Sequence, residues 1–238
     1  MTVKYDLGDF KMAILFFTRT AKVEAMAKIF SAHGASNLNL IRSLICHTRS
    51  ELQKSGYDYF EVDETMQEGA DFAEKLNNAF DKIFSLGYER VVAIGNDCPS
   101  NDATNLKLAL QNWSADCPLL TGKTQRGGVY LLGLTQDAFE KINFKKLHWQ
   151  SEYLYSDLVA YCRNLKLGVF ETSGLSEVNE LKDFSTFNIQ KLSFAIFRIY
   201  SEVCKALVRI IEIKMISALS PDIIAPYADR GPPRTSQL

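Results

Sequence analysis

Residues 91–99 read VVAIGNDCP, an apolar run that ends in a turn of small residues carrying one carboxylate, Asp97. A continuous apolar run of this length predicts a strand buried on both faces of a sheet. Ligands of α/β proteins bind just beyond the carboxyl ends of such strands, which is where Asp97 falls. Residues 126–134 read RGGVYLLGL and place a Gly-Gly turn before a second apolar run. The two stretches predict an α/β sheet that presents an acid at its edge.

Similar signals alternate along the chain before and after these stretches. Apolar or alternating runs predict strands at 12–17, 57–62, 90–94, 118–121, 129–134 and 168–171. Helical patterns predict helices at 21–33, 37–54, 71–86, 101–113 and 151–165, with a short helix and loop at 137–146. Strands and helices in this order predict a parallel or mixed sheet with helices on both faces.

The C-terminal part has a different pattern. Between residues 191 and 219, 19 of 29 residues are apolar and all but one of the charges fall on one stripe, which predicts a long helix. We therefore expect a main domain over 1–185, a helical extension over 186–220 and a proline-containing tail over 221–238. The helix could pack on the body or form a homodimer. Its five Lys or Arg and its wide apolar face also suit contact with a membrane surface.

Composition limits the class of protein. The 238 residues are 47% apolar and 23% charged, as in ordinary soluble globular proteins. The net charge of −1 provides no basic surplus, so we expect no nucleic-acid partner. Five cysteines without CxxC spacing and three separated histidines argue against a zinc site or a disulfide framework. The N-terminus lacks the layout of a signal peptide, which predicts a cytoplasmic location.

The order and spacing of GNDCP and RGGVYLLGL resemble the DUF2064 family of GT-A-like, nucleotide-diphospho-sugar transferase proteins. Members of that family typically read G-[SN]-D-C-P and then, about 30 residues later, D-G-G-Y-Y-L-L-G-L. The resemblance covers roughly residues 12 to 184. It implies a GT-A-like, mainly parallel mixed sheet with helices on both faces. It also implies a glycosyltransferase-like enzyme that binds a nucleoside-diphosphate sugar and transfers the sugar to an unknown acceptor.

The resemblance also implies a Mg²⁺ or Mn²⁺ ion that is held by carboxylates and stabilises the diphosphate. Asp97 would be the catalytic acid and the main ligand of this ion, helped by Glu177. Residues 177–180 read EVNE where relatives read D-V-D-T, so Glu177 keeps a carboxylate and Asn179 loses one. Read from the residues alone, Asp97 could instead cap the following helix or stabilise the turn.

Several residues are candidates for the nucleotide pocket. In GT-A-like folds the loop after the first strand cradles the nucleotide, which points to Thr18 and Arg19, with Lys22 and Lys28 as further cationic candidates. A guanidinium can form a fork with a phosphate, although each of these cations could equally be a solvated surface residue.

Two glycine-containing loops complete the predicted pocket. Gln67 and Gly69 are similar to the family segment Q-x-G-x-x-L-G-x-R-L, which lines the nucleotide pocket. Gly127 and Gly128 would permit close backbone approach to a ligand, although a tight hairpin needs the same residues.

Arg126 stands where the family usually has an acid. A guanidinium there opposes a cation and favours an anion, so we hypothesise that Arg126 pairs with a phosphate and takes over part of the metal ion's work. The lost acids at 126 and 179 also favour an alternative, a catalytically degenerate protein that still binds a nucleotide sugar. A third function is nucleotidyl transfer to a sugar phosphate, because that chemistry shares the architecture.

An aromatic segment follows the second motif. His148, Trp149, Tyr153 and Tyr155 could form a wall for a sugar acceptor, because aromatic faces suit sugar rings. The same residues could equally belong to the aromatic core.

Overall fold

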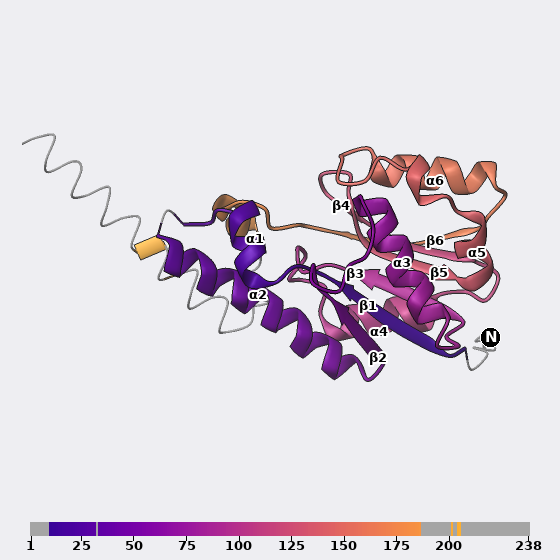
Figure 1. Ribbon diagram of the computed structural model, residues 1–238, viewed down its shortest axis with the longest axis horizontal. Helices are drawn as coiled ribbons and strands as arrows, with labels where there is room; N and C mark the ends of the chain where they lie inside the picture. Colours follow the sequence, from indigo (N-terminus) through magenta and orange to yellow (C-terminus); the bar gives the residue numbers. More distant parts are fainter. Residues whose placement is uncertain (1–9, 32, 187–200, 202–203, 206–238) are drawn as a thin grey trace, which may run out of the picture.

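The computed structural model describes residues 10–31, 33–186, 201 and 204–205. Six strands form one sheet in the order β2-β1-β3-β5-β4-β6 (Figure 1). β1 pairs in parallel with β2 and β3, β4 pairs in parallel with β6, and β5 is antiparallel to β3 and β4. The predicted mixed sheet is therefore confirmed. The strands are β1 (Met12–Phe17), β2 (Asp58–Val62), β3 (Arg90–Ile94), β4 (Leu119–Thr124), β5 (Val129–Thr135) and β6 (Val169–Leu175).

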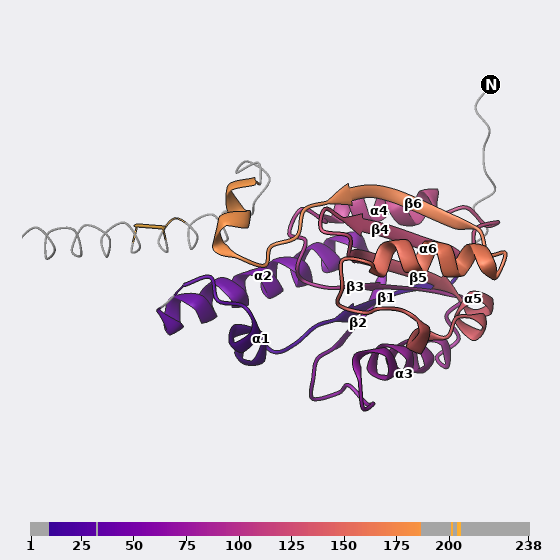
Figure 2. The same ribbon diagram turned by 90° about the horizontal axis from the view of Figure 1, so that it is seen from above.

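Helices cover both faces of this sheet, as predicted. One face packs against α2 and α4, and the other against α3, α5 and α6; Figure 2 shows α4 and α3 on opposite sides. The central strand β3 is buried throughout, and its residues 91–94 are apolar, as expected of a strand covered on both sides. Its first residue, Arg90, is also buried and donates to the carbonyl oxygen of Trp113 at 3.0 Å. The helices are α1 (Ala21–Ala27), α2 (Gly34–Ser55), α3 (Phe72–Phe84), α4 (Ala103–Asn112), α5 (Gln136–Lys141) and α6 (Leu154–Asn164), with 3₁₀ turns η1 (Phe144–Lys146) and η2 (Leu181–Thr186).

The helix predicted over 21–33 is shorter than expected. It ends at Ala27, and the next helix begins at Gly34. The buried side chain of Asn37 explains the break, because its amide donates to the carbonyl oxygens of Ala25 and Lys28 at 3.2 and 2.9 Å. Its Oδ1 also accepts from the backbone nitrogen of Phe30 at 2.7 Å. These bonds replace the helical ones and turn the chain outward.

Strand direction gathers several loops at one edge of the sheet. The carboxyl ends of β1, β2, β3, β4 and β6 all lie at the same edge, together with the amino end of β5. β1 lies between β2 and β3. The connection after β1 therefore leads to β2 on one side, and the connection after β2 leads back to β3 on the other side. Such a topological switch point is where open α/β sheets bind their ligands.

The predicted helix over 191–219 and the tail over 221–238 lie outside the described residues, apart from residues 201, 204 and 205. The expected homodimer or membrane contact through that helix lies there too. Within the part of the chain that the structure describes, no helix combines the length and apolar character needed to cross a bilayer.

Helix α4 offers a matched test of this packing. Leu106 is 1% exposed between α4 and the sheet, whereas Leu108 on the same helix is 52% exposed. We expect Leu106→Ala to lower the free energy of unfolding by about 2–5 kcal/mol, because the substitution leaves a cavity. Leu108→Ala should change it by less than about 0.5 kcal/mol. Urea denaturation of both variants checks this, and equal losses would contradict the packing described here.

Candidate functional site

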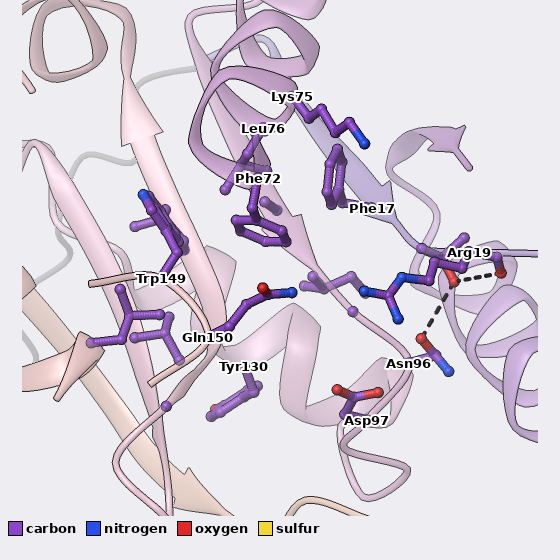
Figure 3. A pocket seen from close by; sticks show the side chains of 18 of the residues that line it. Phe17, Arg19, Phe72, Lys75, Leu76, Asn96, Asp97, Tyr130, Trp149 and Gln150 are labelled. Atoms are coloured by element: carbon purple, nitrogen blue, oxygen red, sulfur yellow. Dashed lines mark hydrogen bonds between the residues drawn. The ribbon is translucent and has the colours of Figure 1, made fainter. Parts of the chain in front are cut away.

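A cleft of about 1060 Å³ opens at the carboxyl-end edge of the sheet. Figure 3 shows aromatic side chains toward one end, with Lys75 beside Phe17, and Arg19, Asn96 and Asp97 toward the other. One end is aromatic, with Phe72 in contact with Phe17 and Trp149 at ring-centroid distances of 5.6 and 5.4 Å. The other end is lined by charged side chains, among which are Arg19, Glu24, Lys28, Asp97, Arg126 and Glu177. A ligand that is part apolar ring and part anion would match both ends.

The turn that carries Asp97 is held from three sides. Thr18 donates its hydroxyl to Oδ1 of Asn96 at 3.3 Å, which links the ends of β1 and β3. The buried His47 of α2 donates from Nε2 to the carbonyl oxygen of Pro99 at 2.8 Å. The backbone nitrogen of Val178 donates to the carbonyl oxygen of Asp97 at 2.7 Å. The turn is therefore fixed before any ligand binds.

The side chain of Asp97 faces the cleft and is 46% exposed (Figure 3). Capping of the following helix falls to Asp102 instead, whose carboxylate accepts from the backbone nitrogen of Asn105 at 2.8 Å. The alternative that Asp97 caps this helix is thus wrong.

Lys28 is the partner of Asp97. Its Nζ lies 2.5 Å from Oδ1 of Asp97 and 3.4 Å from Oε1 of Glu24, and it donates to the carbonyl oxygen of Val178 at 3.3 Å. Burial disfavours the charge, but the two carboxylates outweigh it and raise the pKa of Lys28, so the ammonium stays charged. The sequence named Lys28 only as one of several cations. The four-residue spacing of Glu24 and Lys28 could have indicated the ion pair between these two residues. It gave no signal for the contact of Lys28 with Asp97.

Arg126 forms a two-point ion pair that the sequence did not indicate. Its two terminal nitrogens lie 3.2 and 2.7 Å from the carboxylate oxygens of Asp183. Oδ2 of Asp183 also accepts from the backbone nitrogens of Asn179 and Glu180, both at 2.8 Å. Burial opposes the charge, but Arg126 and the two amides lower the pKa of Asp183 below its usual value. The pair ties the turn after β4 to the segment after β6.

Glu177 lies between these two ion pairs. Its Oε1 is 3.9 Å from a nitrogen of Arg126, and its side chain is mostly buried. Burial raises the pKa of Glu177, the nearby Asp97 adds to the shift, and Arg126 opposes it. The carboxylate that the sequence assigned to a metal ion therefore already faces a cation of the chain.

These residues do not fit a divalent ion as they are arranged. Such an ion needs several oxygen ligands, and Oδ1 of Asp97 is occupied by the ammonium of Lys28. Within the described ranges, no group of three or more His, Cys, Asp or Glu side chains is placed to hold a metal ion. The Mg²⁺ or Mn²⁺ ion at Asp97 and Glu177 stays a prediction.

The other predicted pocket residues divide into two groups. Thr18, Arg19, Gln67 and Gly128 line the cleft. Gln67 donates to the carbonyl oxygen of Thr18 at 2.8 Å and so holds the loop after β1. The remaining two glycines, at 69 and 127, are not among the residues that line the cleft, and both have a positive φ.

Of the predicted acceptor wall, only Trp149 is among the residues that line the cleft. His148 bonds to Asp157, and Tyr155 bonds to Glu171. Gln150, which the sequence did not single out, enters the cleft and points toward Arg19 (Figure 3). Its φ of 59° is a left-handed conformation that side-chain-bearing residues rarely adopt and that concentrates at functional sites.

Comparison with known proteins supports the family and the fold. The family model "Uncharacterized protein conserved in bacteria (DUF2064)" matches residues 44–151, which confirms the resemblance for that part of the chain. Comparison with curated proteins found no match. The fold is similar to that of a "putative nucleotide-diphospho-sugar transferase" from Desulfovibrio desulfuricans G20, with 22% identity and a TM-score of 0.73 over 84% of this chain and 97% of the other.

Two further solved structures are less similar. One is a cytidylyltransferase from Leptospira borgpetersenii serovar Hardjo-bovis, with 18% identity, 86% and 96% coverage and a TM-score of 0.41. The other is Rv0371C from Mycobacterium tuberculosis H37Rv in complex with manganese, with 12% identity, 74% and 97% coverage and a TM-score of 0.40. Similarity at this level carries no argument about this chain.

Gly127 tests a close backbone approach. Its φ is 85°, and a Cβ atom there would lie 2.0 Å from the carbonyl oxygen of Glu152. Gly87 has a φ of 83° but nothing within 4 Å of a Cβ, so it serves as the control. We expect Gly87→Ala to cost about 1–2 kcal/mol through its backbone alone. Gly127→Ala should cost clearly more in urea denaturation, and equal costs would contradict the contact.

Asp183 predicts a pH dependence of stability. Because its pKa is lower in the folded state than its usual 3.8, its stabilisation is present above that value and is lost as the pH falls through the folded-state pKa. We expect Asp183→Asn to cost about 1.5–3 kcal/mol at neutral pH, the value of hydrogen bonds to a charged group. The difference from wild type should shrink below about pH 4. The exposed Asp81 supplies the control, Asp81→Asn, and chemical denaturation across this pH range is the measurement.

Proposed function

We propose that this protein binds a nucleoside-diphosphate sugar in the cleft and transfers the sugar to an acceptor hydroxyl. The observation that carries this proposal is the division of the cleft into an aromatic end and an end that holds Arg19, Lys28 and Arg126 around Asp97. A nucleoside diphosphate is an aromatic base joined to a pyrophosphate, and it has the same division. The fold shared with the "putative nucleotide-diphospho-sugar transferase" supports a transferase that uses such nucleotides.

The base would stack in the aromatic end, against Phe72 and its neighbours Phe17 and Trp149. The diphosphate would lie toward Arg19 and Arg126, whose planar forks suit phosphate oxygens. Thr18, Gln67 and Gly128 would shape the wall between these ends. The sugar would then lie beside Asp97, the most exposed of the cleft carboxylates that form ion pairs with the chain's own cations.

In the transfer step, the acceptor oxygen forms a bond to the anomeric carbon while the bond from that carbon to the diphosphate breaks. The proton of the hydroxyl passes to a carboxylate of the cleft, and we assign this role to Asp97, whose side chain is 46% exposed at the carboxyl end of β3. Negative charge develops on the departing diphosphate, and fixed guanidinium groups stabilise it most effectively because they are already oriented. The predicted Mg²⁺ or Mn²⁺ ion enters no step of this scheme.

Two other functions use the same anion chemistry. Nucleotidyl transfer to a sugar phosphate would release pyrophosphate, whereas sugar transfer releases a nucleoside diphosphate. A binding protein without chemistry would release neither. The ion pairs that engage Asp97 and Arg126 favour the binding protein as the second candidate, because they occupy groups that catalysis would use.

A thermal-shift panel of UDP-, GDP-, ADP-, CDP- and dTDP-sugars tests the proposal. A ligand at 100 times its dissociation constant adds about 2.7 kcal/mol of stability, which such a panel detects. We expect one nucleotide class to stabilise the protein and Arg19→Met to weaken its binding about tenfold or more, the loss of about 1.4 kcal/mol. The exposed Arg163 on α6 provides the control, Arg163→Met. No stabilisation by any member of the panel would overturn the proposal.

A further inference from the structure

The ammonium of Lys28 joins three segments of the chain at the cleft. Lys28 follows α1, Asp97 follows β3, and Val178 follows β6. The ammonium donates to Asp97 and to the carbonyl oxygen of Val178 at 2.5 and 3.3 Å, it forms an ion pair with Glu24 at 3.4 Å, and the side chain is only 14% exposed. Lys28 is therefore a fixed part of the site and not a mobile surface lysine.

A lysine ammonium at this position competes with a metal ion. Hard cations bind through the lone pairs of carboxylate oxygens, and Lys28 donates to one of those on Oδ1 of Asp97. A divalent ion beside Asp97 would also lie within a few ångströms of the ammonium, and like charges repel strongly where water is largely excluded. The second carboxylate, Glu177, faces the guanidinium of Arg126 at 3.9 Å. Both carboxylates that the sequence assigned to the ion already face a cation of the chain.

We propose that Lys28 is the built-in cation of this site, so that the cleft binds a nucleoside diphosphate without a divalent metal ion. This inference rests on the proposed function for the identity of its ligand. Lys28 acts as a positioning residue through Asp97: its charge cancels that of the carboxylate, which would otherwise repel the diphosphate. Arg19 and Arg126 are then the groups that reach the phosphates, because their side chains are 40% and 43% exposed against 14% for Lys28, and each guanidinium has N–H donors besides those that face Glu24 or Asp183.

The chain offers a matched pair of lysines for the test. Lys22, which the sequence also offered for the nucleotide pocket, is exposed on α1 and is not among the residues that line the cleft, so Lys22→Met controls for the loss of a nearby positive charge. Two readouts are needed: the affinity for nucleoside diphosphates with EDTA or with MnCl₂, by calorimetry, and the binding of Mn²⁺ alone, by the loss of its free-ion paramagnetic resonance signal.

For the wild type and Lys22→Met, we expect equal nucleotide affinity with EDTA and with MnCl₂. Lys28→Met should bind Mn²⁺, and adding Asp97→Asn should remove that binding. The nucleotide affinity of the single variant Lys28→Met should fall about tenfold or more in EDTA and recover with MnCl₂. A loss of packing alone would not make the affinity depend on the metal ion.

Two results would overturn the inference. One is a wild-type affinity for nucleoside diphosphates that is about tenfold or more higher with MnCl₂ than with EDTA. The other is Lys28→Met protein that binds Mn²⁺ no better than Lys22→Met. If Lys28→Met does not fold, the wild-type comparison still decides. If no nucleotide binds to any form, the proposed function fails, whereas the Mn²⁺ titration without nucleotide still tests Lys28.

Discussion

The parallel pairing of β1 with both β2 and β3 is the constraint on which the site depends. It brings the loops after three strands to one edge, so that Arg19, Gln67 and Asp97 line one cleft although they are far apart in the sequence. Reversal of β5 then brings the turn between β4 and β5, with Arg126 and Gly128, to the same edge. Because the helices bury both faces of the sheet, that edge is where polar groups can collect.

A network of paired charges holds these loops in place. Lys28 links the end of α1 to the turn after β3, and Arg126 with Asp183 links the turn after β4 to the segment after β6. Helix α2 supports the same region from outside, because Glu51 accepts from the first backbone nitrogen of α4 at 3.0 Å. Half-buried ion pairs of this kind contribute little net stability, since desolvation offsets the attraction. Their effect is to define one arrangement of the loops around the cleft.

Much of the fold could be predicted from the sequence because its signals are local. An apolar run such as VVAIG indicates a buried strand wherever it occurs, and a small-residue turn after it places Asp97 at the sheet edge. The early end of α1 could not be predicted, because it depends on Asn37, a residue ten positions further along. The helical pattern continues across the break, so periodicity alone gives no warning.

The candidate site was harder to predict, since its partners come from distant segments. The pair of Lys28 with Asp97 spans 69 residues and that of Arg126 with Asp183 spans 57. No single-sequence pattern links residues so far apart. The left-handed backbone of Gln150 likewise has no signal, because the residue type does not favour that conformation.

Arg126 has a meaning in the structure that the sequence alone did not provide. Read as a lost acid, it suggested a weakened cation site. In the fold its guanidinium is balanced by Asp183 and lies close to Glu177, so the substitution comes with its own partners. The same holds for Asp97, which is balanced by Lys28. Carboxylates that already face fixed cations attract a metal ion less strongly than free carboxylates do, so the acid at 97 and the guanidinium at 126 have to be interpreted together with their partners.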